Sequence, residues 1–182
     1  WAAYFKEENT KMIFITVGTH EQPFDRLIEY MDRLVQNGKV AEEVVIQTGY
    51  STYEPRHCKW QALFSHDEMV QKIAEARIVI THGGPSSFIA PLRIGKVPIV
   101  VPRKKELHEH VNNHQVDFSR AVSERMGTII VVEEIENLGR IIEEYGNIVD
   151  AMNNGMHSNN IGFCKEFEII VNKVMEKRTK KQ

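Results

Sequence analysis

The chain has 182 residues, of which 42% are hydrophobic, and this is enough to bury one substantial core. We therefore expect one domain. Its 23 basic and 25 acidic residues leave a formal charge of -2, whereas proteins that bind nucleic-acid backbones need a surplus of positive charge. Nucleic acid is therefore not expected as a partner.

Cysteine usage and hydropathy indicate the cellular compartment and whether the chain can span a membrane. The two cysteines, Cys58 and Cys164, give neither a disulfide framework nor the paired spacing that holds zinc, which fits a reducing cytoplasm. The longest apolar runs, such as residues 97–102, are far shorter than the roughly 18 residues that span a bilayer. We expect residues 1–11 to be a tag remnant or a disordered extension, with Met12 as the natural start.

Short apolar runs predict six strands that alternate with amphipathic stretches. These runs are residues 12–17, 43–48, 61–64, 77–81, 97–102 and 128–132. Strands separated by helices, several of them apolar on both faces, favour right-handed crossovers and a parallel sheet covered on both sides. The predicted fold is α/β, a Rossmann-like doubly wound parallel sheet over residues 12–177, followed by a basic tail at residues 178–182.

Amphipathic patterns predict the helices between the strands. Pro23 opens the first helix and Gly38 ends it, while Ser86 or Ser87 is expected to cap the third, which Gly95 closes. A fourth helix is expected to direct inward Val111, Phe118, Ala121 and Val122. Two final helices are expected to carry the apolar residues Ile135, Leu138, Ile141 and Ile142, and then Phe163, Phe167, Ile170, Val171 and Val174.

Ligands of such sheets bind beyond the carboxyl ends of the strands, so the loops there are the ones to search. The loop after residue 17 holds Gly18, Thr19 and His20. Glycine allows a tight turn, and the amides at the start of a helix can face an anion. A glycine turn beside an exposed histidine explains this short motif equally well.

The loop after residue 81 reads T-H-G-G-P-S-S over residues 81–87. Two glycines let the backbone approach a ligand, and a helix that starts at the serines favours negative charge through its dipole. A diphosphate suits such a site. The alternative is a plain turn with a capping serine, which any α/β protein can contain.

The loop at residues 102–115 reads P-R-K-K-E-L-H-E-H-V-N-N-H-Q. Its cations could hold a pyrophosphate or face anionic lipid, and its Asn and Gln side chains offer the donors and acceptors that sugar hydroxyls require. A solvated charged loop is the alternative. His110 and His114 lie one turn apart, but no HExxH pattern and no well-placed carboxylate accompany them, so no metal site is predicted.

Three of these segments together resemble the C-terminal domain of glycosyltransferase family 28 over residues 12–174: I-F-I-T-V-G-T-H at residues 13–20, His82-Gly83-Gly84, and N-N-H-Q at residues 112–115. The V-G-T-H-E-Q-P-F-D run at residues 17–25 is similar to small bacterial polysaccharide-biosynthesis subunits. The resemblance implies one half of a GT-B enzyme, like the soluble half of the two-subunit dolichol-linked N-acetylglucosaminyltransferase. A membrane-anchored N-terminal-half subunit would supply the other half.

The resemblance also implies roles for individual residues. Those near the phosphates of the donor would be Gly18, Thr19 and His20, and the uracil would lie between Phe64 and Met69. The diphosphate and ribose would be bound by His82, Gly83, Gly84, Ser86 and Ser87. The donor sugar would contact Asn113 and Gln115, and the pyrophosphate of the acceptor would meet Arg103, Lys104 and Lys105. The family's ribose-binding glutamate falls on Ala90, so Ser86 or Ser87 would hold the ribose instead.

The function implied is inverting transfer of a hexose, with galactose one candidate, from a UDP-sugar to a lipid-linked saccharide in capsular or exopolysaccharide synthesis. The chain would be cytoplasmic and held at the inner face of the membrane by its partner. No DxD motif occurs, so backbone amides, a helix dipole and cations are expected to stabilise the leaving group without metal or cofactor. His20, with an unperturbed pKa of about 6.5, or a carboxylate of the partner would be the general base.

Two other functions are compatible with the sequence. One is a non-catalytic enhancer subunit that binds the partner but carries no donor site, and it predicts no nucleotide binding. The other is a stand-alone nucleotide-sugar enzyme such as an epimerase. This second function needs a full two-domain cleft, which 182 residues supply only if a homodimer builds it.

Overall fold

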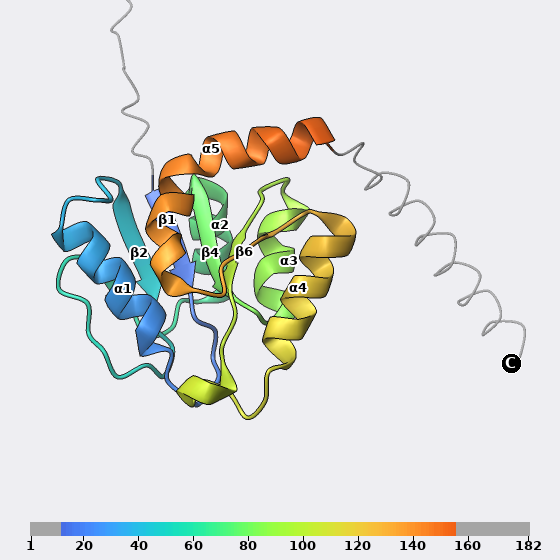
Figure 1. Ribbon diagram of the computed structural model, residues 1–182. Coiled ribbons are helices and arrows are strands. Elements are labelled where there is room, and N and C mark those ends of the chain that lie inside the picture. The colour runs from blue at the N-terminus through green and yellow to red at the C-terminus, as the bar shows by residue number, and fades with distance from the viewer. Residues whose placement is uncertain (1–11, 156–182) are drawn as a thin grey trace, which may run out of the picture. The chain divides into compact units, whose positions relative to one another are not determined.

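In the computed structural model of the chain, residues 12–155 are described, and they form a six-stranded sheet with helices on both faces (Figure 1). Every neighbouring pair of strands is parallel, in the order β3-β2-β1-β4-β5-β6. The strands are β1 (Met12–Thr16), β2 (Glu43–Gln47), β3 (Lys59–Gln61), β4 (Ile78–His82), β5 (Ile99–Val101) and β6 (Ile130–Val131). This confirms the predicted doubly wound parallel sheet.

Helices connect the strands as expected. They are α1 (Asp25–Gln36), α2 (His66–Glu75), α3 (Pro85–Arg93), α4 (His114–Met126) and α5 (Leu138–Gly155), with short 3-10 turns η1 (Lys105–Leu107) and η2 (Ile135–Asn137). The chain divides into two compact units, one ending at Gly146 and one starting at Asn147, and all six strands lie in the first. The helix predicted around Phe163 to Val174 lies outside the described residues. No helix within residues 12–155 is both long and apolar enough to cross a bilayer.

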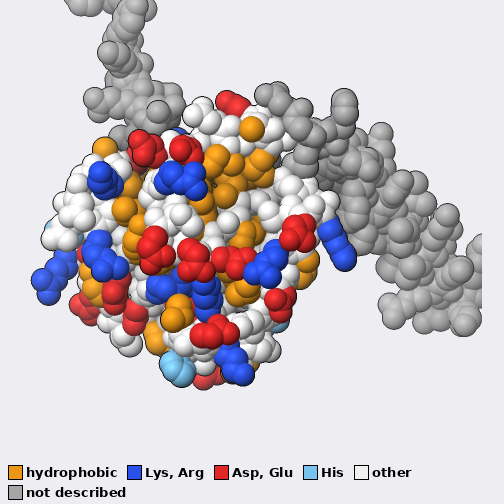
Figure 2. Space-filling view, viewed as in Figure 1, with side chains coloured by type: hydrophobic (Ala, Val, Ile, Leu, Met, Phe, Trp, Pro, Cys, Tyr) orange, Lys and Arg blue, Asp and Glu red, His pale blue; other side chains and the backbone are white. Residues whose placement is uncertain are grey.

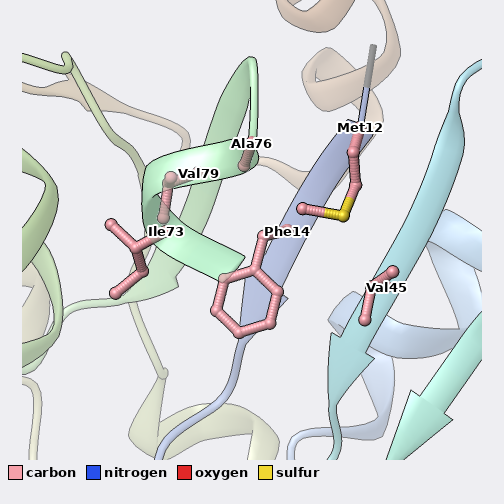
Figure 3. Packing of buried hydrophobic residues seen from close by; sticks show 6 residues of the cluster. All are labelled: Met12, Phe14, Val45, Ile73, Ala76 and Val79. Carbon is pink, nitrogen blue, oxygen red and sulfur yellow. The ribbon is translucent and has the colours of Figure 1, made fainter. Parts of the chain in front are cut away.

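Side chains on one face of the sheet pack against α2, and Figure 3 shows this cluster. Met12, Phe14, Val45 and Val79 come from the strands and meet Ile73 of α2. Each fully buried side chain of this size contributes roughly 1.5 to 3 kcal/mol through removal from water. The core therefore fixes α2 beside the carboxyl ends of β1 and β2.

Two predicted boundaries were wrong, each for a local reason. The third strand ends at Gln61 and does not extend to Phe64, because Ser65 already forms a capping box with Glu68 and begins α2. Neither Ser86 nor Ser87 caps α3: Gly84 is the N-cap, and Pro85 takes the first helical position, where its missing N–H costs nothing.

The inner face of α4 also differs from the prediction. Val111 precedes the helix and is 65% exposed, and Phe118 is 42% exposed, whereas Gln115, Val116 and Ser119 are buried. The helix begins at His114 and turns a partly polar face inward, so the prediction was wrong for Val111 and Phe118, whereas Val122 packs against the buried cluster of Phe88, Val100 and Ile129 as expected. Charged side chains of both signs are interspersed on the surface seen in Figure 2, in keeping with the near-balanced composition.

Candidate functional site

A cleft of about 700 Å³ opens at the carboxyl edge of the sheet, where the strand order reverses between β1 and β4. This is the position at which doubly wound sheets bind ligands, and the volume suits a small organic molecule. The cleft is bounded by the loop after β1, one side of α2 and the start of α3. It brings together seven of the predicted residues: Gly18, Thr19, His20, Met69, His82, Ser86 and Ser87.

The imidazole of His82 fills the space between two glycines at the base of this cleft. A Cβ atom added at Gly18 would overlap the ring, and so would one added at Gly84. The Ser87 hydroxyl lies 3.1 Å from Nδ1 and 3.2 Å from Nε2 of His82. Gly18 and Gly84 belong to separate motifs, but both lack the Cβ atom that would overlap the His82 ring, so each lets the backbone pack directly against it.

Burial lowers the pKa of His82 to about 4, and the positive charge of Arg103 acts in the same direction. A hydrogen bond with the Thr16 backbone acts the opposite way but is outweighed. His82 is therefore neutral near pH 7. The hydrogen bond with the Thr16 backbone uses the single N–H of this neutral ring, so the positive potential at this end of the cleft comes from the dipole at the start of α3.

Gln47 joins the strand ends behind the cleft. Its Nε2 donates to Thr16 Oγ1 at 3.0 Å, and its Oε1 accepts from the Phe64 amide at 3.1 Å. Phe64 itself turns away from the cleft and packs edge-on against Phe14, with ring centroids 6.0 Å apart. Of the two side chains expected beside the uracil, only Met69 lines the cleft.

Arg103 is buried and does not reach an acceptor from this position, contrary to the expectation for the triplet at residues 103–105. It is 1% exposed, and its guanidinium lies 4.8 Å from the Phe24 ring centroid. Nη2 donates to the Val17 carbonyl at 2.9 Å, while Nη1 donates to the carbonyls of Gln22, Pro23 and Glu109. One cation thus holds the loop after β1 against the loop after β5.

Glu109, in the loop after β5, also stabilises the contact between this loop and the loop after β1. Its carboxylate accepts two hydrogen bonds from Arg26 of α1, at 2.7 and 3.0 Å, and one from the Lys104 amide at 2.9 Å. Burial lowers the pKa of Arg103 to about 10, against the opposing effect of Glu109. Arg103 therefore stays charged at neutral pH. Nη1 and Nη2 of its guanidinium, and the carboxylate of Glu109, bond to groups of the protein itself.

The other expected sugar and acceptor contacts lie outside the cleft lining. The buried Gln115 side chain accepts from the Gly83 amide at 3.1 Å and from the Arg103 amide at 3.2 Å, so it ties the two loops together. Asn113 Oδ1 accepts from the Lys105 amide at 2.8 Å. The Lys104 ammonium pairs with Glu134 at 2.9 Å, and the Lys105 side chain is exposed.

The family model of the glycosyltransferase family 28 C-terminal domain matches residues 12–159. The chain belongs to this family. The resemblance predicted from the three motifs is thereby confirmed, and the Rossmann-like α/β sheet agrees with it.

Two groups of known proteins are similar to this family 28 chain. The UDP-N-acetylglucosamine transferase subunit ALG13 of Yarrowia lipolytica (strain CLIB 122 / E 150) is 31% identical over 75 residues, which are 41% of this chain and 36% of the relative. The solved glycotransferase of kitacinnamycin has a TM-score of 0.55 at 13% identity, over 80% of this chain and 38% of that chain. The glycosyltransferase SnogD from Streptomyces nogalater has a TM-score of 0.48 at 17% identity, over 68% and 31%. The chain thus covers between 31% and 38% of the length of these proteins.

Six residues of the family 28 cleft were not predicted as site residues: Thr16, Gln47, His66, Val70, Ile73 and Ala90. Thr16 and Gln47 are the last residues of β1 and β2, at the carboxyl edge where ligands were expected, so their position in the sequence could have identified them. Val70 and Ile73 follow helical periodicity, which indicates a core face as readily as a cleft wall. Among the residues that the structure describes, no three His, Cys, Asp or Glu side chains are grouped so that they could hold a metal ion.

Replacing Arg103 by methionine tests whether this buried cation holds the two loops. Four carbonyl oxygens lose their donor, and we expect the free energy of unfolding to fall by about 3 kcal/mol or more, measured by urea denaturation. Arg120→Met is the matched control, because Arg120 only pairs with Glu133 at the surface, and it should cost less than about 1 kcal/mol. Equal losses in the two variants would contradict the role given to Arg103.

The lowered pKa of His82 predicts a pH dependence of stability. An unfolded histidine titrates near pH 6.5, so between pH 6.5 and about 4 the unfolded chain binds a proton that the native chain does not. The stabilisation is complete above pH 6.5 and is lost as the pH falls toward 4, by at most about 3 kcal/mol. The free energy of unfolding of His82→Phe should fall less steeply across this window than that of the unaltered chain or the exposed-site variant His57→Phe. Parallel curves for all three would show that His82 is not held neutral.

Proposed function

We propose that this chain is the donor-binding and catalytic subunit of a split, inverting glycosyltransferase that transfers a hexose from a UDP-sugar to a lipid-linked saccharide. The observation that carries the proposal is the cleft at the strand-order reversal, with His82 closed between Gly18 and Gly84 at its base. Family membership makes glycosyl transfer the relevant chemistry. The ALG13 relative is described as a UDP-N-acetylglucosamine transferase subunit, which supports uridine diphosphate as the nucleotide.

The diphosphate would lie against the first turn of α3. Gly84 lets the backbone approach, and the Ser86 and Ser87 side chains line the same part of the cleft. As the bond between the anomeric carbon and the diphosphate breaks, negative charge develops on the departing UDP. Hydrogen bonds from the hydroxyls of Ser86 and Ser87, with the helix dipole, would stabilise this charge in place of a divalent metal.

The nucleoside would occupy the part of the cleft next to α2. Met69, Val70 and Ile73 give that wall an apolar surface suited to the face of a uracil ring. Ser86 or Ser87 would hold the ribose, since Ala90 stands where the family resemblance places a glutamate. The hexose would extend toward the loop that carries Asn113.

The acceptor would come from outside this chain. Because Arg103 is buried, Lys104 and Lys105 are the cations of the expected triplet that remain for the pyrophosphate of a lipid carrier. The ALG13 relative is named as a subunit of a transferase, which supports a second subunit that completes the enzyme. We place that half on a membrane-anchored partner subunit at the inner face of the cell membrane, in polysaccharide synthesis.

Calorimetric titration with UDP and UDP-hexoses, with and without magnesium, tests the donor site. We expect saturable binding that does not require the metal. Gly84 has an ordinary φ of -75, so Gly84→Ala needs no backbone change, but its Cβ would overlap His82. This variant should bind UDP at least about tenfold more weakly, a loss of about 1.4 kcal/mol.

Gly146→Ala is the matched control, because nothing lies within 4 Å of the added Cβ, and it should bind as the unaltered chain does. Circular dichroism would show that both variants are folded. A folded chain that binds no UDP would contradict a donor site on this chain and favour the enhancer function. A homodimer with epimerase activity and no need of a partner would favour the stand-alone enzyme.

A further inference from the structure

Two histidines from different loops are fixed in the same way by the backbone. His20 Nδ1 accepts a hydrogen bond from the Gln22 amide at 3.2 Å, and His110 Nδ1 accepts one from the Asn112 amide at 3.4 Å. Their ring centroids lie 4.6 Å apart, with the rings tilted by 43°. His20 lines the cleft, and His110 lies behind it at 8% exposure.

These hydrogen bonds fix the position of the proton on each neutral ring. A backbone amide can only donate, so Nδ1 of His20 and of His110 must keep its lone pair. The single hydrogen of a neutral imidazole then sits on Nε2. Each ring therefore presents an N–H donor at Nε2, the nitrogen that its own loop leaves uncovered.

A third ring supports this arrangement from the start of α4. His114 Nδ1 contacts the side-chain oxygen of Asn112, the same residue whose amide donates to His110. The centroids of His110 and His114 are 4.6 Å apart, with the rings at 74°. His110 is thus held between two other imidazoles, and it in turn supports one side of the His20 ring.

The orientation of His20 conflicts with its expected role as the general base. A base must offer a lone pair to the acceptor hydroxyl, and the lone pair of neutral His20 is already used by the Gln22 amide. What His20 offers at Nε2 is a donor, in a loop whose carbonyls are held by the Arg103 guanidinium. A fixed donor beside a buried cation favours an anionic oxygen.

We propose that His20 donates a hydrogen bond from Nε2 to a phosphoryl oxygen in the cleft, with His110 as its positioning residue, and that it does not act as the base. This inference rests on the proposed function. In the transfer, the acceptor oxygen bonds to the anomeric carbon as the bond to the diphosphate breaks, and UDP leaves with the electron pair. The hydroxyl proton passes to a carboxylate of the partner subunit.

Long-range ¹H–¹⁵N NMR spectra of the full chain test the proton positions directly. The nitrogen shifts distinguish the two neutral tautomers, and spectra of His20→Gln and His110→Gln assign the signals. We expect both rings to carry the proton on Nε2. A proton on Nδ1 of His20 would overturn the proposal, whatever the outcome of the UDP titration.

UDP binding by two variants tests the donor role. The amide of glutamine can place an N–H near the position of the imidazole Nε2, so His20→Gln should weaken UDP binding by no more than about threefold, and His20→Ala by about tenfold. The exposed-site variant His57→Ala should bind as the unaltered chain does. Turnover in the assembled complex should follow the same order, whereas a general base would be lost equally in both His20 variants, which would overturn the proposal.

A further arm separates the two sources of the phosphoryl oxygen. If it belongs to the donor, UDP alone shifts the His20 Nε2 signal; if it belongs to the acceptor, inorganic pyrophosphate shifts this signal in the presence of saturating UDP. No shift with either ligand would overturn the proposal. If Gly84→Ala weakens UDP binding and His20→Ala does not, the donor role of His20 is refuted and the donor site remains. If the chain binds neither UDP nor pyrophosphate, both the donor role of His20 and the proposed donor site are refuted.

Discussion

The arrangement of the site depends on one buried cation. Arg103 reaches from the end of β5 under the loop that follows β1 and donates to carbonyl oxygens at Val17, Gln22, Pro23 and Glu109. Loops carry backbone groups that must find partners when they are buried, and here one guanidinium supplies them for two loops at once. These hydrogen bonds hold the path of the loop that carries His20, and so they help to shape the cleft wall.

The same loops close around a second group, the neutral ring of His82. Gly18 and Gly84 come from different crossovers of the sheet, and both are required by one imidazole. This packing brings the start of α3 against the loop after β1, at the reversal of strand order where the sheet leaves room for a ligand. In the proposed function, the serine hydroxyls and the helix dipole at this cleft would stabilise a diphosphate as it departs, which would link the fold to glycosyl transfer.

Much of the fold could be predicted from the sequence, because strands buried on both faces leave continuous apolar runs and their connections leave glycines. The cleft loops could be predicted for the same reason, since parallel strands end at one edge. The inward turns of Arg103 and Gln115 could not be predicted, because their partners lie up to 86 residues away and Arg and Gln side chains are usually exposed. The place of Phe64 was missed because a short exposed edge strand, Lys59–Gln61, gives no hydrophobic pattern to set the boundary.

The most direct test of the central claim is a crystal structure of the chain with UDP. We expect the diphosphate at the first turn of α3, within reach of His82, Ser86 and Ser87, and the uracil against Met69. UDP bound elsewhere, for example in the polar groove lined by Tyr53, His57 and Trp60, would contradict it.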